Sequence, residues 1–487
     1  MRRGLRFLGL GLLLLLLILV VNALTTKSRQ VAVEAAPEIP VDEDRAAQHL
    51  SRAITFQTVS HQDPKDNDPS AFDGLHKALA EMFPKVHQTL TQEVVSGHAL
   101  LYTWKGSDAA KAPIILMAHQ DVVPIEPGTE GDWQRPPFSG AIDDGYIWGR
   151  GAIDCKNGVI GLLEAVEVLL TQGYSPSRTI YLAFGHDEEV GGNKGAHAIV
   201  ELLASRNVRA SFVLDEGMVV TEGILKGVSA PVALVGLAEK GYVSVELVAE
   251  TTGGHSSMPP RPTSAGLLAT AILRLENNPM PARIEGPARL LFETLAPEMP
   301  LGNRVILANL WLLSPLAKKV LSGSPATDAL LRTTTAPTIL EGSVKENVLP
   351  KRARAVINFR ILPGDTSASV LDHVKRTIAD DRVQAHILDG FAVKEPSPVS
   401  DIAGLGYKAI EKSIRQVFPG AIVAPSLVLG ATDSSHFQPI ADGVYRFQPQ
   451  RMKDEDRTRF HGTNERVSVK NFAEHVRFYA QLIKNAD

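Results

Sequence analysis

The sequence predicts an α/β fold in which a mostly parallel sheet is flanked by helices. Three short apolar runs, each followed by polar residues, are typical of buried strands: residues 114–117, 179–184 and 211–214. Between the first two runs, residues 158–170 place apolar side chains at helical spacing. Ligands bind at strand ends in open α/β sheets, so the polar residues after these runs are the candidates for function.

Size and composition limit the classes of protein that this chain can belong to. With 487 residues, of which 44% are hydrophobic, the chain can form a large core and two domains. The net charge of -4, without a basic stripe interleaved with aromatics, argues against a nucleic-acid partner. Cys155 is the only cysteine, which excludes an intrachain disulfide. We expect it to be a small buried residue rather than a soft metal ligand.

The N-terminus has the pattern of an export signal. Arg2, Arg3 and Arg6 precede an apolar run over residues 7–21, so residues 1–24 are predicted to be a signal anchor or a signal peptide. Residues 22–24 extend the run to about the length of a membrane span, which favours a retained anchor. In either case the basic end stays inside, and the catalytic body lies on the periplasmic or extracellular side. Polar residues 25–43 are predicted to be a linker.

Imidazole and carboxylate side chains gather after the strands. Zinc takes these ligands, and two neighbouring zinc ions need a bridging group, for which Asp154 is a candidate. His119 can bind metal, and Asp121 can orient its ring. Glu188 and Glu189 are adjacent, so one can be a ligand while the other is the general base. Each of the three polar clusters, at residues 119–121, 149–158 and 186–192, is by itself also compatible with a solvated loop. The presence of all three in this order favours a metal site.

From about residue 44 onward, the sequence resembles the di-zinc metallopeptidase family of carboxypeptidase S, the aminoacylases and bacterial carboxypeptidase G. The resemblance is greatest to the branch of carboxypeptidase S and the N-fatty-acyl-amino-acid hydrolases. The matching motifs are His119-Gln120-Asp121, Gly149-Arg150-Gly151 to Asp154, Asp187-Glu188-Glu189, Asp215-Glu216-Gly217, Gly254-His255-Ser256-Ser257, Asn358-Phe359-Arg360, Gly430-Ala431-Thr432-Asp433 and His461-Gly462-Thr463-Asn464-Glu465.

The resemblance implies a zinc-peptidase-like catalytic domain interrupted by an α+β lid, through which some relatives form dimers. A new, partly alternating strand over residues 241–249 places the boundary near Ala238. The expected parts are catalytic residues 44–237, a lid or dimerisation domain over residues 238–394, and catalytic residues 395–487. Residues 285–336 look like an elaboration of the lid. They could pack within the lid, line an acyl pocket, contact the membrane surface or form a dimer interface.

The family's site implies two zinc ions per subunit, bridged by Asp154. By this match, His119 and Asp215 are the other ligands of one zinc ion, and Glu189 and His461 are the other ligands of the second. Asp121 orients His119, and Glu188 is the general base. The resemblance also implies a cis peptide bond between Asp154 and the residue that follows it.

Other motif residues are expected to contact the substrate. By resemblance, His255 stabilises the charged tetrahedral intermediate, in its own subunit or in a neighbour's. Asn347 and Arg360 match residues that bind a free carboxylate, a role that suits the planar fork of arginine, although Arg360 could instead pair with a lid acid. The loop that begins at Gly430 could offer backbone N–H groups to the substrate.

We therefore expect a zinc-dependent amidohydrolase or metallopeptidase that cleaves the amide bond before a C-terminal amino acid with a free carboxylate. A carboxypeptidase acting on peptides is one form of this function. An N-acyl-amino-acid hydrolase, which could run as a synthase, is the alternative. A binding protein that retains the fold without catalysis is disfavoured, because every expected ligand and the base are present.

Overall fold

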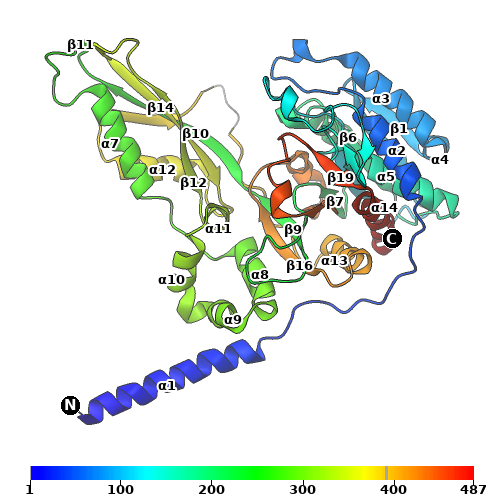
Figure 1. The fold of residues 1–487 in the computed structure, drawn as a ribbon, viewed down its shortest axis with the longest axis horizontal. Helices are drawn as coiled ribbons and strands as arrows, with labels where there is room; N and C mark the ends of the chain where they lie inside the picture. The colour runs from blue at the N-terminus through cyan, green and yellow to red at the C-terminus, as the bar shows by residue number, and fades with distance from the viewer. Residues whose placement is uncertain (1, 390–392) are drawn as a thin grey trace.

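The computed structural model describes residues 2–389 and 393–487. Two sheets dominate it: a large one embedded among helices, and a separate four-stranded one that extends away from it (Figure 1). Helix α1 (Arg2–Thr25) stands outside both and is joined to them by an extended segment.

The large sheet contains the predicted strands at its centre. Strands β6, β3, β7 and β17 are parallel neighbours, while the pairings of β2 with β6 and of β17 with β9 are antiparallel. The α/β class with a mostly parallel sheet is confirmed. In spatial order the strands are β1 (Thr91–Val95), β2 (Ala99–Trp104), β6 (Ile180–Gly185), β3 (Ile114–His119), β7 (Phe212–Asp215), β17 (Val444–Arg446), β9 (Val232–Glu239), β8 (Val220–Thr221) and β18 (Arg451–Met452), with β16 (Ile422–Val428) paired to β9.

Helices cover both faces of this sheet, because consecutive side chains of its central strands are apolar and point to opposite sides. Leu116 of β3 joins the core formed with α2, α5, α13 and α14, whereas its neighbour Met117 joins the core formed with α6. Helix α5 is buried along nearly its whole length, as its almost continuous apolar sequence requires. The helices are α2 (Glu43–Ile54), α3 (Pro69–Met82), α4 (Pro84–Thr89), α5 (Lys156–Thr171), α6 (Ala196–Ser205), α13 (Leu405–Val417) and α14 (Val469–Ala486).

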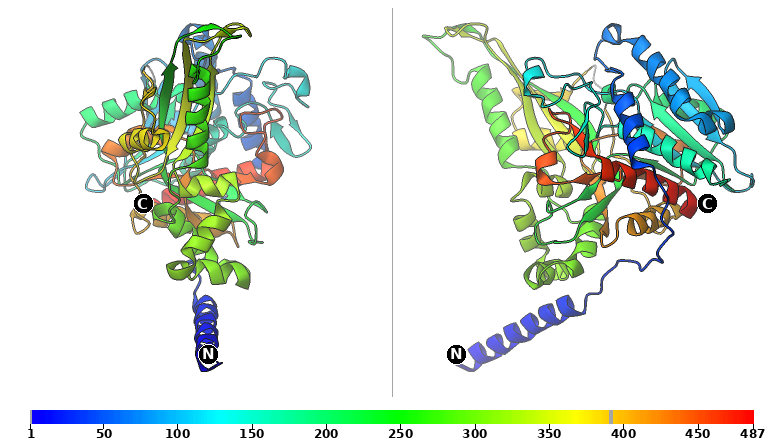
Figure 2. Two further views of the ribbon diagram at one scale, coloured as in Figure 1. Left: turned by 90° about the vertical axis from the view of Figure 1, so that its left-hand side faces the viewer. Right: turned by 45° about the vertical axis from the view of Figure 1, so that its right-hand side comes forward.

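The four-stranded sheet is antiparallel and has its own hydrophobic core. We call this sheet, its two helices and the short strand pair beyond its far end the lid (Figures 1 and 2). Its strands are β12 (Thr334–Glu341), β14 (Arg352–Ile361), β10 (Gly241–Glu250) and β15 (Val383–Ile387); its helices are α7 (Ser264–Asn277) and α12 (Ser367–Ile378); the strand pair is β11 (Gly254–His255) with β13 (Val348–Leu349).

Residues 285–336 form four short helices that pack against the large sheet. Leu291 and Phe292 of the first helix share a core with Ile422 and Ala424 of β16, so this segment belongs structurally to the catalytic body as much as to the lid. The helices are α8 (Gly286–Leu295), α9 (Leu301–Leu307), α10 (Leu310–Leu321) and α11 (Pro325–Leu331).

The remaining elements are short. A three-stranded sheet orders the loops around the C-terminal motif and consists of β4 (Ile142–Asp143), β5 (Tyr146–Trp148) and β19 (Arg466–Ser468). The 3-10 helices are η1 (Pro64–Asp66), η2 (Glu130–Asp132), η3 (Glu188–Val190), η4 (Ala296–Glu298), η5 (Asp433–Ile440) and η6 (Asp454–Asp456).

Candidate metal centre

Asp154 lies at the middle of a buried cluster of imidazoles and carboxylates. Its Oδ1 is 2.9 Å from Nε2 of His119, and its Oδ2 is 2.8 Å from Nε2 of His461. His119 is the last residue of β3, whereas His461 lies in a loop near the C-terminus. Two histidines that are far apart in the sequence thus face the two oxygens of one carboxylate, and the Asp154–Cys155 peptide bond is cis, as predicted.

One further carboxylate lies on each side of Asp154. Oε2 of Glu189 is 3.4 Å from Nε2 of His461, and Oε1 of Glu216 is 3.4 Å from Nε2 of His119. The side chains therefore form two half-sites, each with one histidine and one glutamate, and Asp154 faces both. This arrangement gives each half-site one nitrogen and two oxygen donors, a set that suits zinc.

Asp215, which was predicted to be a ligand, has one carboxylate oxygen bonded to the backbone. Its Oδ2 accepts a hydrogen bond from the backbone N–H of Ser434 at 2.8 Å. Asp215 is the last residue of β7, and Glu216 is the first residue beyond the strand. Only Glu216 faces His119. Glu216 stands in one of the sequence motifs, where no role was predicted for it.

Asp121 links His119 to the pair of glutamates. Its carboxylate accepts the backbone N–H groups of Glu188 and Glu189, both at 3.2 Å. Its backbone oxygen is 3.0 Å from Nδ1 of His119, and its carboxylate is 3.4 Å away. A proton on Nδ1 leaves the lone pair on Nε2, the nitrogen that faces Asp154.

Glu465 is a second residue whose role the sequence analysis missed. It is fully buried, forms an ion pair with Arg150 at 2.8 Å, and accepts backbone N–H groups of the loop that carries Asp154. A charged residue in a polar motif gives no sign of such burial. Only the fold brings the end of the chain onto this loop.

The electrostatics of the cluster fit divalent cations. Burial and the neighbouring Asp154 raise the pKa of Glu216 to about 7, and burial raises the pKa of Glu188 well above its usual range. The hydrogen bond to Asp154 raises the pKa of His461 to about 10. Oε1 of Glu189 is buried without a hydrogen-bond partner. Crowded carboxylates with a free buried oxygen are the donors that a metal ion would satisfy.

The residues expected to contact the substrate are dispersed. Arg360 lies opposite Tyr242 where β10 begins, with its guanidinium carbon 4.9 Å from the centre of that ring. His255 and Asn347 lie together beyond the other end of β10: His255 pairs with the residue after Asn347, and Ser256 donates to the Asn347 oxygen at 3.1 Å. A strand of ten residues separates the two groups by roughly 30 Å.

Gly430 lies in the loop between β16 and η5, close to the cluster. Within this loop, Thr432 and Ser434 bond to Glu239 and Asp215. A Cβ built on Gly430 would meet no atom within 4 Å, so the backbone is open on that side.

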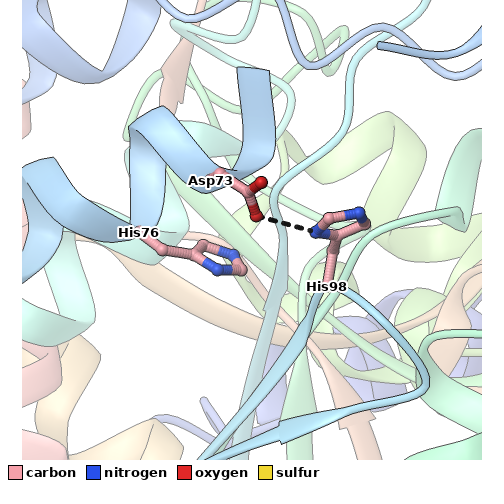
Figure 3. Close-up of side chains that lie close together, drawn as sticks. All are labelled: Asp73, His76 and His98. Atoms are coloured by element: carbon pink, nitrogen blue, oxygen red, sulfur yellow. Dashed lines mark ion pairs between the residues drawn. The ribbon is translucent and has the colours of Figure 1, made fainter. Parts of the chain in front are cut away.

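Asp73, His76 and His98 form a separate group of side chains (Figure 3), and this group contacts Gln120, the residue after β3. Asp73 and His76 come from α3, and Nδ1 of His98 is 3.6 Å from Asp73. Nε2 of His76 is 2.8 Å from Oε1 of Gln120, whose amide nitrogen donates to the backbone oxygens of His98 and Phe184. Since this fixes the orientation of the amide, His76 must be the donor. The contacts hold Gln120 in place, and with it the neighbouring His119.

The fold and the cluster define the class of a metal-dependent hydrolase. The chain matches Peptidase family M20/M25/M40 over residues 115–485 and belongs to this family.

Curated relatives cover nearly the whole chain. N-fatty-acyl-amino acid synthase/hydrolase PM20D1 of Xenopus tropicalis is 43% identical over 96% of this chain and 88% of its own length. Probable carboxypeptidase S-like 2 of Dictyostelium discoideum is 41% identical over 96% of this chain and 91% of its own. Carboxypeptidase S of Saccharomyces cerevisiae is 31% identical over 92% and 85%. The expected family and branch are thereby confirmed.

Solved structures share the fold. Human carnosine dipeptidase 1 superposes with a TM-score of 0.62 at 17% identity, over 91% of this chain and 96% of that one. The M20 family metallo-carboxypeptidase Sso-CP2 of Sulfolobus solfataricus gives 0.62 at 19%, over 92% and 99%.

Proposed function

We propose that the cluster binds two zinc ions bridged by Asp154. His119 and Glu216 would be the other ligands of one ion, and Glu189 and His461 would be the other ligands of the second. The two half-sites around Asp154 support this assignment, and Glu216 takes the place that the sequence analysis gave to Asp215. The unpaired Oε1 of Glu189 offers a further donor atom.

Glu188 is the proposed general base. When bound, the ions supply Lewis-acid chemistry that polarises an amide carbonyl and makes water acidic enough to lose a proton near neutral pH. Glu188 would take that proton and later deliver it to the leaving amine. Its raised pKa, which burial causes, suits the second step, because a carboxyl group that holds its proton more tightly can still carry that proton to the amine. Asp121 holds the backbone of Glu188 and so positions it.

Arg360 and Asn347 are proposed to hold the carboxylate of the departing amino acid. Arginine binds a carboxylate with two parallel N–H groups. Arg360 is aligned by stacking on Tyr242, and Oδ1 of Asn347 is buried without a partner. The open backbone at Gly430 would add a neutral donor.

His255 is proposed to act in the site of a second subunit. It lies at the exposed far end of the lid, remote from the metal cluster of its own chain. A homodimer formed through the lid would bring His255 and the adjacent Asn347 to the neighbour's cluster, where Arg360 is supplied by the neighbour itself. This placement explains why one chain keeps these residues apart.

The proposed reaction is hydrolysis of the amide bond to a C-terminal amino acid with a free carboxylate. The single observation that carries it is the double half-site around Asp154, in a chain that also bears a carboxylate-binding arginine on the lid. Peptides are one class of substrate. N-fatty-acyl amino acids are the second, favoured by the 43% identical relative named for that activity.

We further propose that α1 is a membrane anchor and that the catalytic body lies outside the cytoplasm. The helix is long and apolar enough to cross a bilayer, and a signal peptide would show the same pattern. The division into catalytic residues 44–237 and 395–487, with a lid over residues 238–394, is supported by the two separate sheets and their separate cores.

The experiment offers the zinc-loaded chain three substrates: N-lauroyl-leucine, glycyl-leucine and leucinamide. Release of free leucine would be followed by mass spectrometry. Preference for the lauroyl substrate identifies a fatty-acyl hydrolase, and preference for the dipeptide identifies a carboxypeptidase. Cleavage of leucinamide alone would contradict the role of Arg360, since that substrate has no carboxylate.

A further inference from the structure

Helix α10 exposes an apolar face to solvent. Trp311, Leu316 and Val320 are 66%, 47% and 60% exposed, and Leu312 is also exposed. Leu312, Leu316 and Val320 follow each other at intervals of four residues, so they line one side of the helix, and Trp311 is next to them. We call these four residues the apolar foot. A continuous exposed patch of this kind marks a surface that contacts another apolar phase.

The apolar foot is next to the end of α1. The side chain of Asn22 donates to the backbone oxygen of Ala308 and to Oδ1 of Asn309, both at 2.9 Å, and Asn309 donates back to the backbone oxygen of Leu19 at 3.0 Å. Asn309 is fully buried by this contact, as is Ala23 of α1. In Figures 1 and 2, the C-terminal end of α1 lies beside α9 and the rest of α1 extends away from the body.

This junction fixes the depth of the apolar foot relative to α1. A helix that spans a bilayer ends at the headgroup region, and Asn22 is one turn from the end of α1. Ala308 and Asn309, the two residues just before α10, are bonded to that same turn. The foot would therefore stand at the outer surface of the bilayer wherever α1 crosses it.

The chemistry of α10 suits that position. Trp311, whose Nε1 donates to Asn309 at 3.3 Å, has the apolar body and polar edge typical of residues at a membrane interface. Lys318 and Lys319 follow in the last turn of α10 and can reach anionic headgroups. Apolar side chains with flanking lysines distinguish a lipid surface from an ordinary protein contact, which is depleted in lysine.

We propose that the apolar foot inserts into the outer headgroup boundary of a lipid bilayer, beside α1. The proposal rests on the proposed anchoring by α1. Leu310 and Leu321 of α10 pack against the core that joins α8 to β16, so α10 is rigidly connected to the large sheet. Insertion would hold the catalytic body at a fixed orientation to the membrane, close to substrates that dissolve in it.

The test uses the full-length chain in vesicles of neutral and anionic phospholipid. The native cysteine, Cys155, is only 1% exposed, so a cysteine introduced by Leu316→Cys can be labelled alone with a nitroxide. Val344→Cys, at a fully exposed apolar position between β12 and β13, is the matched control. Val320→Cys repeats the measurement should the first variant fail to fold.

The readout compares two relaxation agents: oxygen, which concentrates in lipid, and a nickel chelate, which stays in water. We expect oxygen to dominate at Leu316 and Val320, and nickel to dominate at Val344. If the chains sediment with the vesicles but the nickel chelate reaches Leu316 as readily as Val344, the insertion of the apolar foot is refuted. The anchoring by α1 would not be affected by that result. Protection from both agents would indicate a second protein copy on this face and also overturn it. Chains that do not sediment would refute foot and anchor together.

Discussion

The backbone N–H of Asp154 donates to Oε1 of Glu465 at 3.1 Å. The same oxygen accepts the N–H groups of Gly151 and Ile153, and Oε2 pairs with Arg150. One buried carboxylate from the C-terminal motif thus orders the loop that presents Asp154. Glu465 therefore fixes the orientation of Asp154, the residue that faces both half-sites.

Replacing Glu465 with glutamine should weaken metal binding without removing a ligand. The amide lacks the charge that balances Arg150, and it places an NH₂ group where an acceptor is needed. We expect zinc affinity to fall by about 10- to 100-fold, the usual effect of residues that orient ligands. Competition with a chromogenic chelator measures it. Glu474→Gln is the control, because Glu474 also pairs with an arginine, Arg451, but outside the cluster. Equal affinity of the two variants would contradict the role of Glu465.

The Glu188→Gln variant should separate catalysis from metal binding. Glutamine keeps the shape of Glu188 but cannot take up a proton, so kcat should fall by at least about 10²- to 10⁴-fold. Zinc content should stay at the wild-type value, because Glu188 is not among the proposed ligands. Glu189→Gln is the matched variant one position along and should lose zinc. Near-normal turnover by Glu188→Gln would disprove the assignment of the base.

Glu216 and Asp215 can be distinguished by zinc content. Only the Glu216 carboxylate faces His119, whereas Asp215 bonds to the backbone of Ser434. We expect Glu216→Gln to retain about one zinc ion per chain, since one half-site loses a ligand. Asp215→Asn should retain both ions. Elemental analysis after dialysis gives the counts, and the reverse result would restore Asp215 as the ligand.

The choice between Asp215 and Glu216 illustrates what the sequence could predict. Buried strands and the order of polar motifs are local patterns, so β3, β6, β7 and the residues after them were predictable. Which of two consecutive acids faces His119 depends on the direction in which the backbone leaves the end of β7, a detail that no local pattern encodes. The burial of Glu465 depends on a contact between residues 311 positions apart in the sequence.

Long-range placement also explains the other differences. His255 and Arg360 belong to one predicted lid, but the length of β10 separates them, and the sequence does not indicate which subunit each serves. For residues 285–336, the sequence alone is compatible with four different roles. Their apolar run is divided by Asn309, which is buried against α1, so that α10 turns its other apolar residues outward.

His475 should make the chain sensitive to acid. It is fully buried in α14, neither ring nitrogen has a hydrogen-bond partner, and burial lowers its pKa to about 3 from 6.5. Between these values the unfolded chain binds a proton that the folded chain does not, so the free energy of unfolding falls as pH decreases. At about pH 5 the loss amounts to roughly 2 kcal/mol.

His475→Leu should remove this part of the pH dependence. Urea unfolding of the metal-free chains at about pH 7 and about pH 5 gives the comparison, and the variant should lose roughly 2 kcal/mol less than the wild type. His373→Leu is the control, because His373 of α12 is only partly buried and its Nε2 lies 3.0 Å from the backbone oxygen of Asn278. Parallel losses in His475→Leu and the wild type would show that His475 is not kept neutral by burial.

Mixing two inactive variants tests whether His255 serves the neighbouring subunit. His255→Ala leaves a complete metal cluster, and Glu188→Gln leaves an intact lid. In a mixed dimer, the cluster of the first chain would receive His255 from the second, so one of its two sites would be active. Random exchange of subunits should therefore restore about a quarter of wild-type activity, since half of the dimers are mixed. A preparation that stays inactive, although exchange is verified by two affinity tags, would show that His255 acts within its own chain or not at all. A chain carrying both substitutions, mixed with His255→Ala, is the matched control and should stay inactive, because neither partner then supplies the histidine.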